Sequence, residues 1–167
     1  MLDPAGTRRF RVLLFAALPD RIHAEVLSAL GSPQAILDGG DGRLAVTFVA
    51  DRESFVGEAE AGVLSRLLGV ELDLGGLARA LLLGDDAGAP CRIRRSGSTT
   101  PGLPDRIAFE SDSSLFELTL ERRRRLETDQ AALGTGVPPS GTHLRPLEEL
   151  DDDPRRFGEP PAPPPQP

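Results

Sequence analysis

The chain lacks residues on which several classes of binding site depend. Trp and Tyr are absent, so base-stacking platforms and the aromatic floors of sugar sites have few residues to draw on. The single cysteine, Cys91, excludes both an internal disulfide and a cysteine metal cluster. The formal net charge of -7 argues against nucleic acid as the main partner.

Motifs for catalysis are also missing. The sequence contains no nucleophile elbow, no phosphate-binding glycine loop before a helix and no paired histidine motif. His23 stands at an alternating strand position, which favours a partly exposed strand histidine over a catalytic base. An enzyme that uses carboxylates such as Asp85 and Asp86 has the least support. We therefore expect a protein that is not an enzyme, with no catalytic residue, metal or cofactor.

The length and the Pro pattern predict one domain and a tail. We expect a globular domain over residues 1–150, because 167 residues suffice to bury a core. Residues 151–167 are rich in Pro and lack apolar periodicity, which predicts a disordered tail. The apolar run Val12–Leu18 is too short to span a membrane, and we interpret it as a strand rather than a signal peptide. On this interpretation the chain carries no export signal.

Alternating apolar residues predict strands on both sides of a helical segment. The expected strands are Phe10–Phe15, Arg21–Ala29, Gln34–Leu37, Arg43–Val49, a short piece at Phe55–Val56, Cys91–Arg95, Arg106–Glu110 and Leu115–Leu126. Residues 63–68 follow helical spacing and end at Gly69. A second helix follows, in which Asp73 caps an apolar stripe of Leu74, Leu77, Ala78, Leu81 and Leu82.

Two connections between the early strands have distinct compositions. Asp38–Gly42 contains three glycines and two aspartates, which is typical of a hairpin turn with positive φ angles. Leu30 is an apolar residue at a loop tip, followed by Gly31. Local evidence favours a leucine folded back onto the sheet, whereas an exposed leucine would suit insertion into a lipid surface.

These elements predict an α+β fold. We expect a curved antiparallel sheet with a short two-helix insert packed on its concave face. Such an arrangement commonly encloses an apolar cavity, although periodicity alone does not distinguish a hollow interior from a filled one.

Two stretches carry a resemblance to a known family. Residues 21–48, RIHAEVLSALGSPQAILDGGDGRLAVTF, and residues 63–85, VLSRLLGVELDLGGLARALLLGD, are similar to LolB, the outer-membrane receptor that accepts lipoproteins from their periplasmic carrier. The shared pattern is an Arg-apolar strand entry, a Leu-Gly loop, a glycine-centred hairpin, and two helices that each end in Leu-Gly. The order and spacing match from about Phe10 to Gly84.

The resemblance implies a function and a location. A LolA/LolB-like half-barrel would accept the acyl chains of a lipoprotein, or phospholipid, in an apolar cavity and assist lipoprotein localisation. The location would be the periplasmic side of the outer membrane, with a periplasmic carrier protein as a partner. The provisional cavity lining is Val12, Leu14, Val26, Val46, Phe48, Leu77 and Leu81, and Leu30 would be the membrane-contacting residue of its loop.

The chain departs from the family pattern at its start. The family's secretion signal, lipid-attachment cysteine, first helix and first strand have no counterpart before Phe10. Ala29 replaces the Pro that commonly precedes the loop leucine. The alternative to a lipid carrier is a structural or interaction domain with a filled core, whose Pro-rich tail binds a partner.

Overall fold

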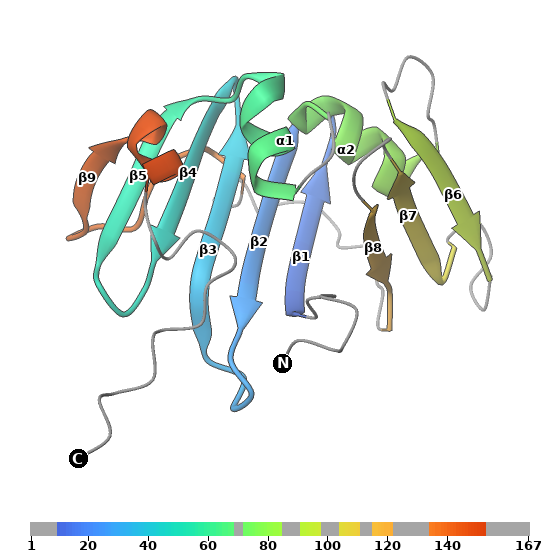
Figure 1. Ribbon diagram of the computed structural model, residues 1–167, viewed down its shortest axis with the longest axis horizontal. Helices are drawn as coiled ribbons and strands as arrows, with labels where there is room; N and C mark the ends of the chain where they lie inside the picture. The colour runs from blue at the N-terminus through green and yellow to red at the C-terminus, as the bar shows by residue number, and fades with distance from the viewer. Residues whose placement is uncertain are drawn as a thin grey trace.

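Strands dominate the part of the chain that the structure describes, together with two α-helices (Figure 1). The structure is a computed structural model that describes residues 10–68, 72–84, 91–97, 104–110, 115–121 and 134–152. The predicted α+β class is confirmed. The expected single sheet is instead two sheets, and neither is closed into a barrel.

The larger sheet has six strands, in the order β1-β2-β3-β4-β5-β9. Its strands are β1 (Arg11–Ala17), β2 (Arg21–Leu27), β3 (Pro33–Gly40), β4 (Arg43–Phe48), β5 (Glu53–Glu58) and β9 (His143–Pro146). The first five strands form an antiparallel meander, whereas β9 pairs parallel to β5. Sequence analysis did not predict β9, because its four residues are too few to show an alternation.

The smaller sheet has three antiparallel strands, in the order β6-β7-β8. They are β6 (Arg92–Ser96), β7 (Arg106–Glu110) and β8 (Leu115–Thr119). The predicted strand at Leu115–Leu126 is confirmed over its first part, and its residues beyond 121 lie outside the described ranges, as do Asp85 and Asp86. Of the tail predicted at residues 151–167, the first two residues belong to a 3-10 helix and the others lie outside the described ranges.

Two short helices connect the sheets in sequence. They are α1 (Ala61–Leu68) and α2 (Leu74–Leu82), and a 3-10 helix (Leu147–Asp152) follows β9. The Asp73 carboxylate accepts a hydrogen bond from the Gly76 backbone N–H, which confirms the predicted cap of α2. Leu74, Leu77, Ala78 and Leu81 are buried as the stripe predicted, while Leu82 is partly exposed.

The β3–β4 turn is shorter than its composition suggested. Asp41 (φ 52°) and Gly42 (φ 73°) alone form the turn, and both have the positive φ that a two-residue hairpin requires. β3 continues through Gly40, so Asp38 lies within the strand and pairs with His23 and Ala45. The prediction that Asp38 belongs to the turn is wrong, because a tight hairpin needs only two of the five residues.

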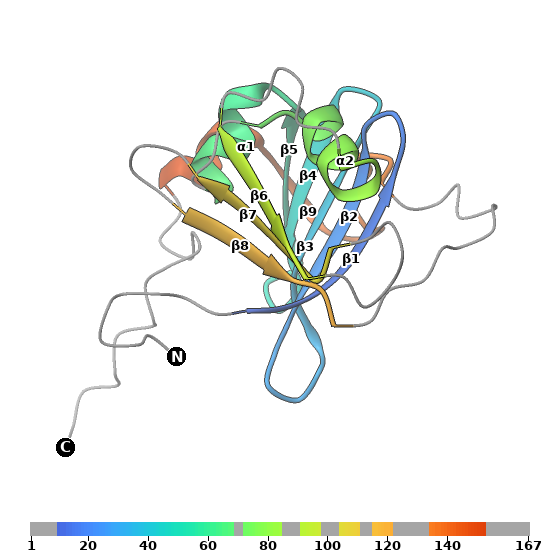
Figure 2. The same cartoon turned by 90° about the vertical axis from the view of Figure 1, so that its right-hand side faces the viewer.

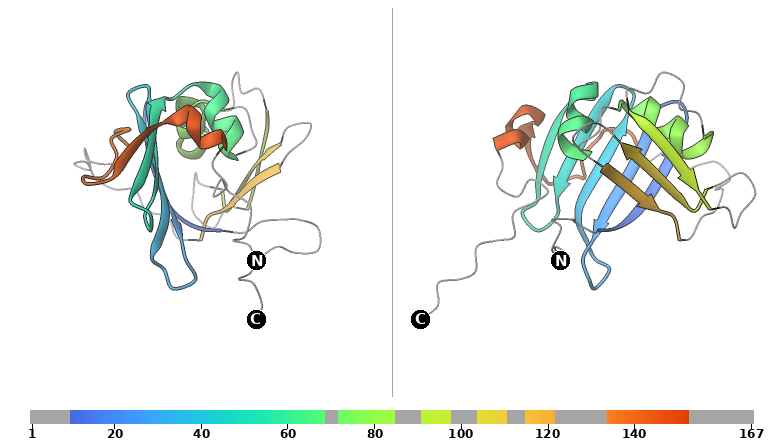
Figure 3. Two further views of the ribbon diagram at one scale, coloured as in Figure 1. Left: turned by 60° about the vertical axis from the view of Figure 1, so that its left-hand side comes forward. Right: turned by 45° about the vertical axis from the view of Figure 1, so that its right-hand side comes forward.

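The helices and the small sheet lie on one side of the large sheet. Figure 2 shows the two sheets facing each other at an angle, with α1 and α2 above the space between them. Figure 3 shows the same layers from two other directions. Buried apolar side chains from both sheets and both helices belong to one continuous cluster. This cluster is the core, and it lies on the face of the large sheet called the inner face below.

Candidate ligand-binding site

Three rows of side chains cross the inner face of the large sheet, and two of them contain residues of the provisional lining. The strand register aligns them from β1 toward β5, and side chains aligned in this way point to the same face. The first row is Val12, Val26, Ala35 and Phe48, and the second is Leu14, Ala24, Leu37, Val46 and Phe55. Five residues of the provisional lining therefore share this face: Val12, Leu14, Val26, Val46 and Phe48.

Exposure of the apolar side chains falls along these two rows from β1 to β4. Val12 is 40% exposed and Val26 is partly buried, whereas Phe48 is 9% exposed. In the second row Leu14 and Leu37 are partly buried, and Val46 and Phe55 are fully buried. The inner face thus has an open half near β1 and a filled half under β4 and β5.

Helix α2 adds buried side chains to the core, and the strands that it contacts most are β1 and β2. Leu77 and Leu81 are buried within the same cluster as Val46 and Phe48. Large apolar side chains therefore occupy the interior here, as the filled-core alternative expected. These four residues of the provisional lining pack against protein rather than facing an uncovered surface.

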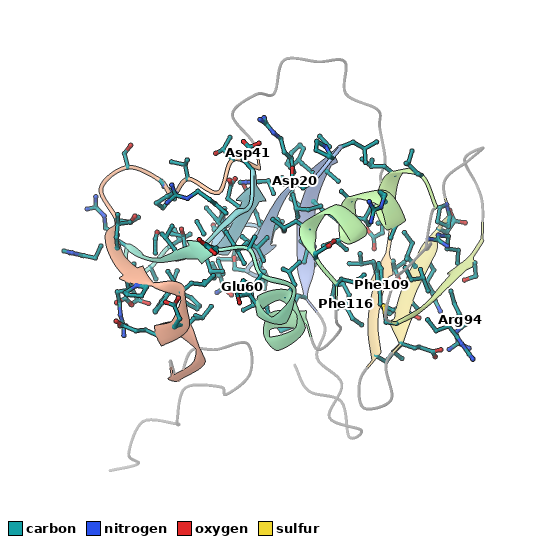
Figure 4. All side chains as sticks on the ribbon, turned by 90° about the horizontal axis from the view of Figure 1, so that it is seen from above. Asp20, Asp41, Glu60, Arg94, Phe109 and Phe116 are labelled. Atoms are coloured by element: carbon teal, nitrogen blue, oxygen red, sulfur yellow. The ribbon has the colours of Figure 1, made fainter. Side chains whose placement is uncertain are left out.

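The small sheet presents apolar side chains to the same interior. Phe109 and Phe116 are cross-strand neighbours whose ring centroids lie 5.9 Å apart, and Figure 4 labels them next to each other beside the small sheet. Phe109 is fully buried, whereas Phe116 and its strand neighbour Leu118 are only partly covered. Both sheets therefore contribute partly covered apolar side chains that pack against one core, and we take the open half of the inner face as the candidate site.

Leu30 projects away from the protein. It is 95% exposed, at the tip of the β2–β3 connection that extends beyond the sheet in Figure 1. The turn closes on itself: Gly31 N–H donates to the Ser28 carbonyl (3.0 Å), and Ser28 N–H donates to the Ser32 carbonyl (2.8 Å). Gly31 adopts φ 87°, which favours glycine. The local expectation that Leu30 folds back onto the sheet is wrong, because the closed turn holds it beyond the surface of the sheet.

A polar cluster lies on the opposite face of the large sheet. His23 Nδ1 lies 2.7 Å from Asp38 Oδ2, and its Nε2 lies 3.2 Å from Glu25 Oε1. The Asp38 carboxylate also accepts hydrogen bonds from the backbone N–H groups of Gly134, Thr135 and Gly136. His23 is 8% exposed, so the prediction of a partly exposed histidine is wrong.

The cluster favours the charged forms of both main partners. The hydrogen bond to Asp38 and that to Glu25 raise the pKa of His23 above its usual value of 6.5, against the opposing effect of burial. Burial alone would raise the pKa of Asp38, but the hydrogen bonds from His23 and the three backbone N–H groups lower it. Both ring nitrogens face carboxylates of the protein, so this arrangement is structural: it binds residues 134–136 to β2 and β3.

The same segment covers more of the outer face. Gly134 lies so close to Gly40 that a side chain at position 40 would collide with the Gly134 carbonyl. Farther along, the hydroxyls of Thr47, Ser54 and Thr142 form a chain with separations of 2.8 and 2.9 Å. The sequence did not predict that residues 134–136 lie on this face, because their contacts with Asp38 join positions almost a hundred residues apart. The only local signal was the alternation that places His23 and Glu25 on one face.

Within the described ranges, no group of three or more His, Cys, Asp or Glu side chains is arranged to hold a metal ion. None of the helices in these ranges is long and apolar enough to cross a membrane. Comparisons of the chain with protein-family models, curated proteins and solved structures find no match.

Proposed function

We propose that the protein binds acyl chains of lipoproteins or phospholipids at the open half of its inner face and assists lipoprotein localisation to the outer membrane. The observation that carries the proposal is the decline of exposure along the inner face, from Val12 to the buried Phe48. Aligned apolar side chains that are left partly uncovered gain free energy when an apolar ligand covers them, at about 0.8 kcal/mol per buried methylene. The proposal requires no reaction.

The proposed site contains only some of the residues of the provisional lining. Val46, Phe48, Leu77 and Leu81 already fill the interior, so the acyl chain would contact Val12, Leu14 and Val26 instead. Leu37 lies on the same face, and Phe116 and Leu118 of β8, which pack against the same core, would extend this surface. An acyl chain lying along these residues would need no rearrangement of the buried core.

The exposed loop supports a membrane role for the same protein. A leucine that is 95% exposed gains about 1.5–3 kcal/mol when it enters an apolar environment. With its closed turn, Leu30 would contact the outer membrane from the periplasmic side while the ligand passes from a periplasmic carrier. This location and the carrier rest on the resemblance to LolB.

Displacement of a fluorescent fatty acid tests the binding. We expect saturable binding of the probe to the folded chain and competition by a triacylated lipoprotein or by phospholipid. Absence of saturable binding by protein with a cooperative unfolding transition would refute the proposal.

Vesicle binding tests the loop separately. Leu30→Glu should reduce partitioning into phosphatidylethanolamine–phosphatidylglycerol vesicles about tenfold or more, because a carboxylate replaces the inserting side chain. The matched control is Leu144→Glu, since Leu144 is also an exposed leucine (66%) but lies on β9. Equal loss in both variants would refute a specific role of the loop.

The filled half favours the second candidate, an interaction domain without a ligand. Val46 and Phe55 are fully buried, which is the packing that a filled core predicts. In that case the fatty acid would not bind, and the partner would bind the Pro-rich residues 151–167. Removal of these residues would then abolish partner binding, whereas on the lipid-binding proposal it leaves probe affinity unchanged.

A further inference from the structure

The ends of the two sheets differ in how they are protected against pairing with another chain. β9 has only four residues and contains Pro146, and β6 carries Arg92, Arg94 and Arg95. Short strands, proline and charge are the features by which sheet edges avoid association. β8 has Glu117 at its centre. Three of the four edges in the described ranges therefore carry such a feature.

β1 is the exception. Its sequence is RVLLFAA, with six apolar residues in succession after Arg11 and no proline or acidic residue. Within the described ranges β1 pairs with β2 alone. Val12 and Leu13 point to opposite faces, yet they are 40% and 46% exposed. Because these two adjacent side chains are exposed on opposite faces of the sheet, the outer edge of β1 is open to solvent at this point.

We propose that two copies of the chain associate through β1, which pairs with β1 of the second copy in antiparallel orientation about a twofold axis at Leu14. Leu14 is the central residue of the seven, so this register pairs the whole strand. A twofold axis brings the same patch of both copies together and closes the assembly at a dimer. This inference depends only on the edge of β1 and not on the proposed ligand.

Side-chain sizes suit this register. On the inner face, Val12 lies opposite Ala16 of the second copy, and the two Leu14 side chains meet at the axis. On the outer face, Leu13 lies opposite Phe15 of the second copy. Apolar and aromatic cross-strand pairs of this kind stabilise antiparallel sheets.

Charge selects the strand direction. In the antiparallel register Arg11 lies opposite Ala17 of the second copy, so the two arginines stand at opposite ends of the joined strands, about 20 Å apart. A parallel pairing would place the two Arg11 side chains side by side, where like charges destabilise the sheet.

The mass in solution tests the dimer. Light scattering over a concentration series should show the full chain rising from 17.8 kDa toward twice that mass. Leu13→Lys should raise the dimer dissociation constant about tenfold or more, because it places a charge at the paired edge of each copy. The control, Leu144→Lys, introduces the same charge at the β9 edge and should dimerise like the unmodified chain.

Several results would overturn the proposal. They are a mass that stays at 17.8 kDa at every concentration, open-ended growth beyond a dimer, or equal effects of the two lysine variants. Circular dichroism of each variant verifies that a change in mass does not reflect unfolding.

Disulfide cross-linking tests the register. In a Cys91→Ser background, Leu14→Cys should be oxidised by diamide to a covalent dimer, because paired Cα atoms lie about 4.5–5.5 Å apart, within the range of a disulfide. Leu13→Cys should cross-link at least about tenfold more slowly, since position 13 faces position 15 of the second copy and the two sulfur-bearing residues are about 8 Å apart. Faster cross-linking at position 13 would refute the register.

Discussion

The two halves of the inner face contain similar apolar residues, but these are buried in one half and partly exposed in the other. Val46 on β4 is fully buried, whereas Val12 on β1 is 40% exposed on the same face of the same sheet. The difference lies in what covers each strand. The 3-10 helix and buried core side chains pack against β4 and β5, whereas β1 contacts α2 but has a strand neighbour on one side only within the described ranges. Composition alone therefore does not separate a core residue from a candidate ligand contact.

The largest test compares one substitution in the filled half with the same substitution at the β1 edge, where Leu13 lies on the outer face. Leu44→Ala should lower the free energy of unfolding by about 2–5 kcal/mol, because Leu44 is fully buried and its removal leaves a cavity. Leu13→Ala should lower it by less than about 1 kcal/mol, since Leu13 is 46% exposed. Urea denaturation below the concentrations that favour association measures both. Equal losses would mean that β1 is as fully packed as β4.

The second test compares two aspartates of one hairpin. Asp38→Asn should lower the free energy of unfolding by about 2–3 kcal/mol, because the buried carboxylate accepts hydrogen bonds from His23 and three backbone N–H groups. Asp41→Asn should change it by less than about 1 kcal/mol, because Asp41 forms an exposed ion pair with Arg21 and asparagine tolerates its positive φ.

A matched result for the two aspartate variants would contradict a structural role of the polar cluster. Limited proteolysis gives a second readout, because Asp38→Asn should increase cleavage near residues 134–136, which the carboxylate binds.

Local patterns predicted most elements of the fold but not their long-range partners. Alternation alone located β7 at Arg106–Glu110, and Asp73 with its apolar stripe located α2. The role of Asp38 depends on backbone groups almost a hundred residues away, which no local pattern encodes. The split into two sheets was missed for the same reason, since strand periodicity does not specify which strands pair.

For the candidate site, the sequence predicted only which side chains form the apolar face of each strand. Periodicity placed Val12 with Leu14, and Val46 with Phe48, on one face of their own strands. The register then aligns these residues and Val26 on one face of the sheet. Which of them remain uncovered depends on α2 and on the edge position of β1. The lipid-binding role of these residues stays a prediction.

The third test asks whether the open half binds the ligand. Val26→Ser should weaken fatty-acid binding about tenfold, because it removes apolar surface from the proposed site and leaves a hydroxyl that the acyl chain cannot pair. Val49→Ser is the control, since Val49 is similarly apolar and 38% exposed but follows β4, outside the inner-face rows. Val26 lies on β2, so this variant leaves the β1 edge unchanged. Equal affinities would place the ligand elsewhere.

The smallest expected effect is a pH dependence of stability from the polar cluster. The raised pKa of His23 means that its contribution is fully present below pH 6.5 and is lost as the pH rises through the higher folded-state pKa. The lowered pKa of Asp38 means that its contribution is present above its usual value of 3.8 and is lost as the pH falls through the lower folded-state pKa. Together they place the greatest stabilisation between these two usual values.

His23→Gln should remove the loss of stability on the alkaline side, while His143→Gln, at an exposed position, should leave it unchanged. Denaturant titrations from pH 5 to pH 9 compare the two variants with the unmodified chain. The expected effect is smaller than that of Asp38→Asn, because the three backbone N–H groups still hold the carboxylate when His23 is neutral. An unchanged alkaline slope in His23→Gln would show that another group is responsible for it.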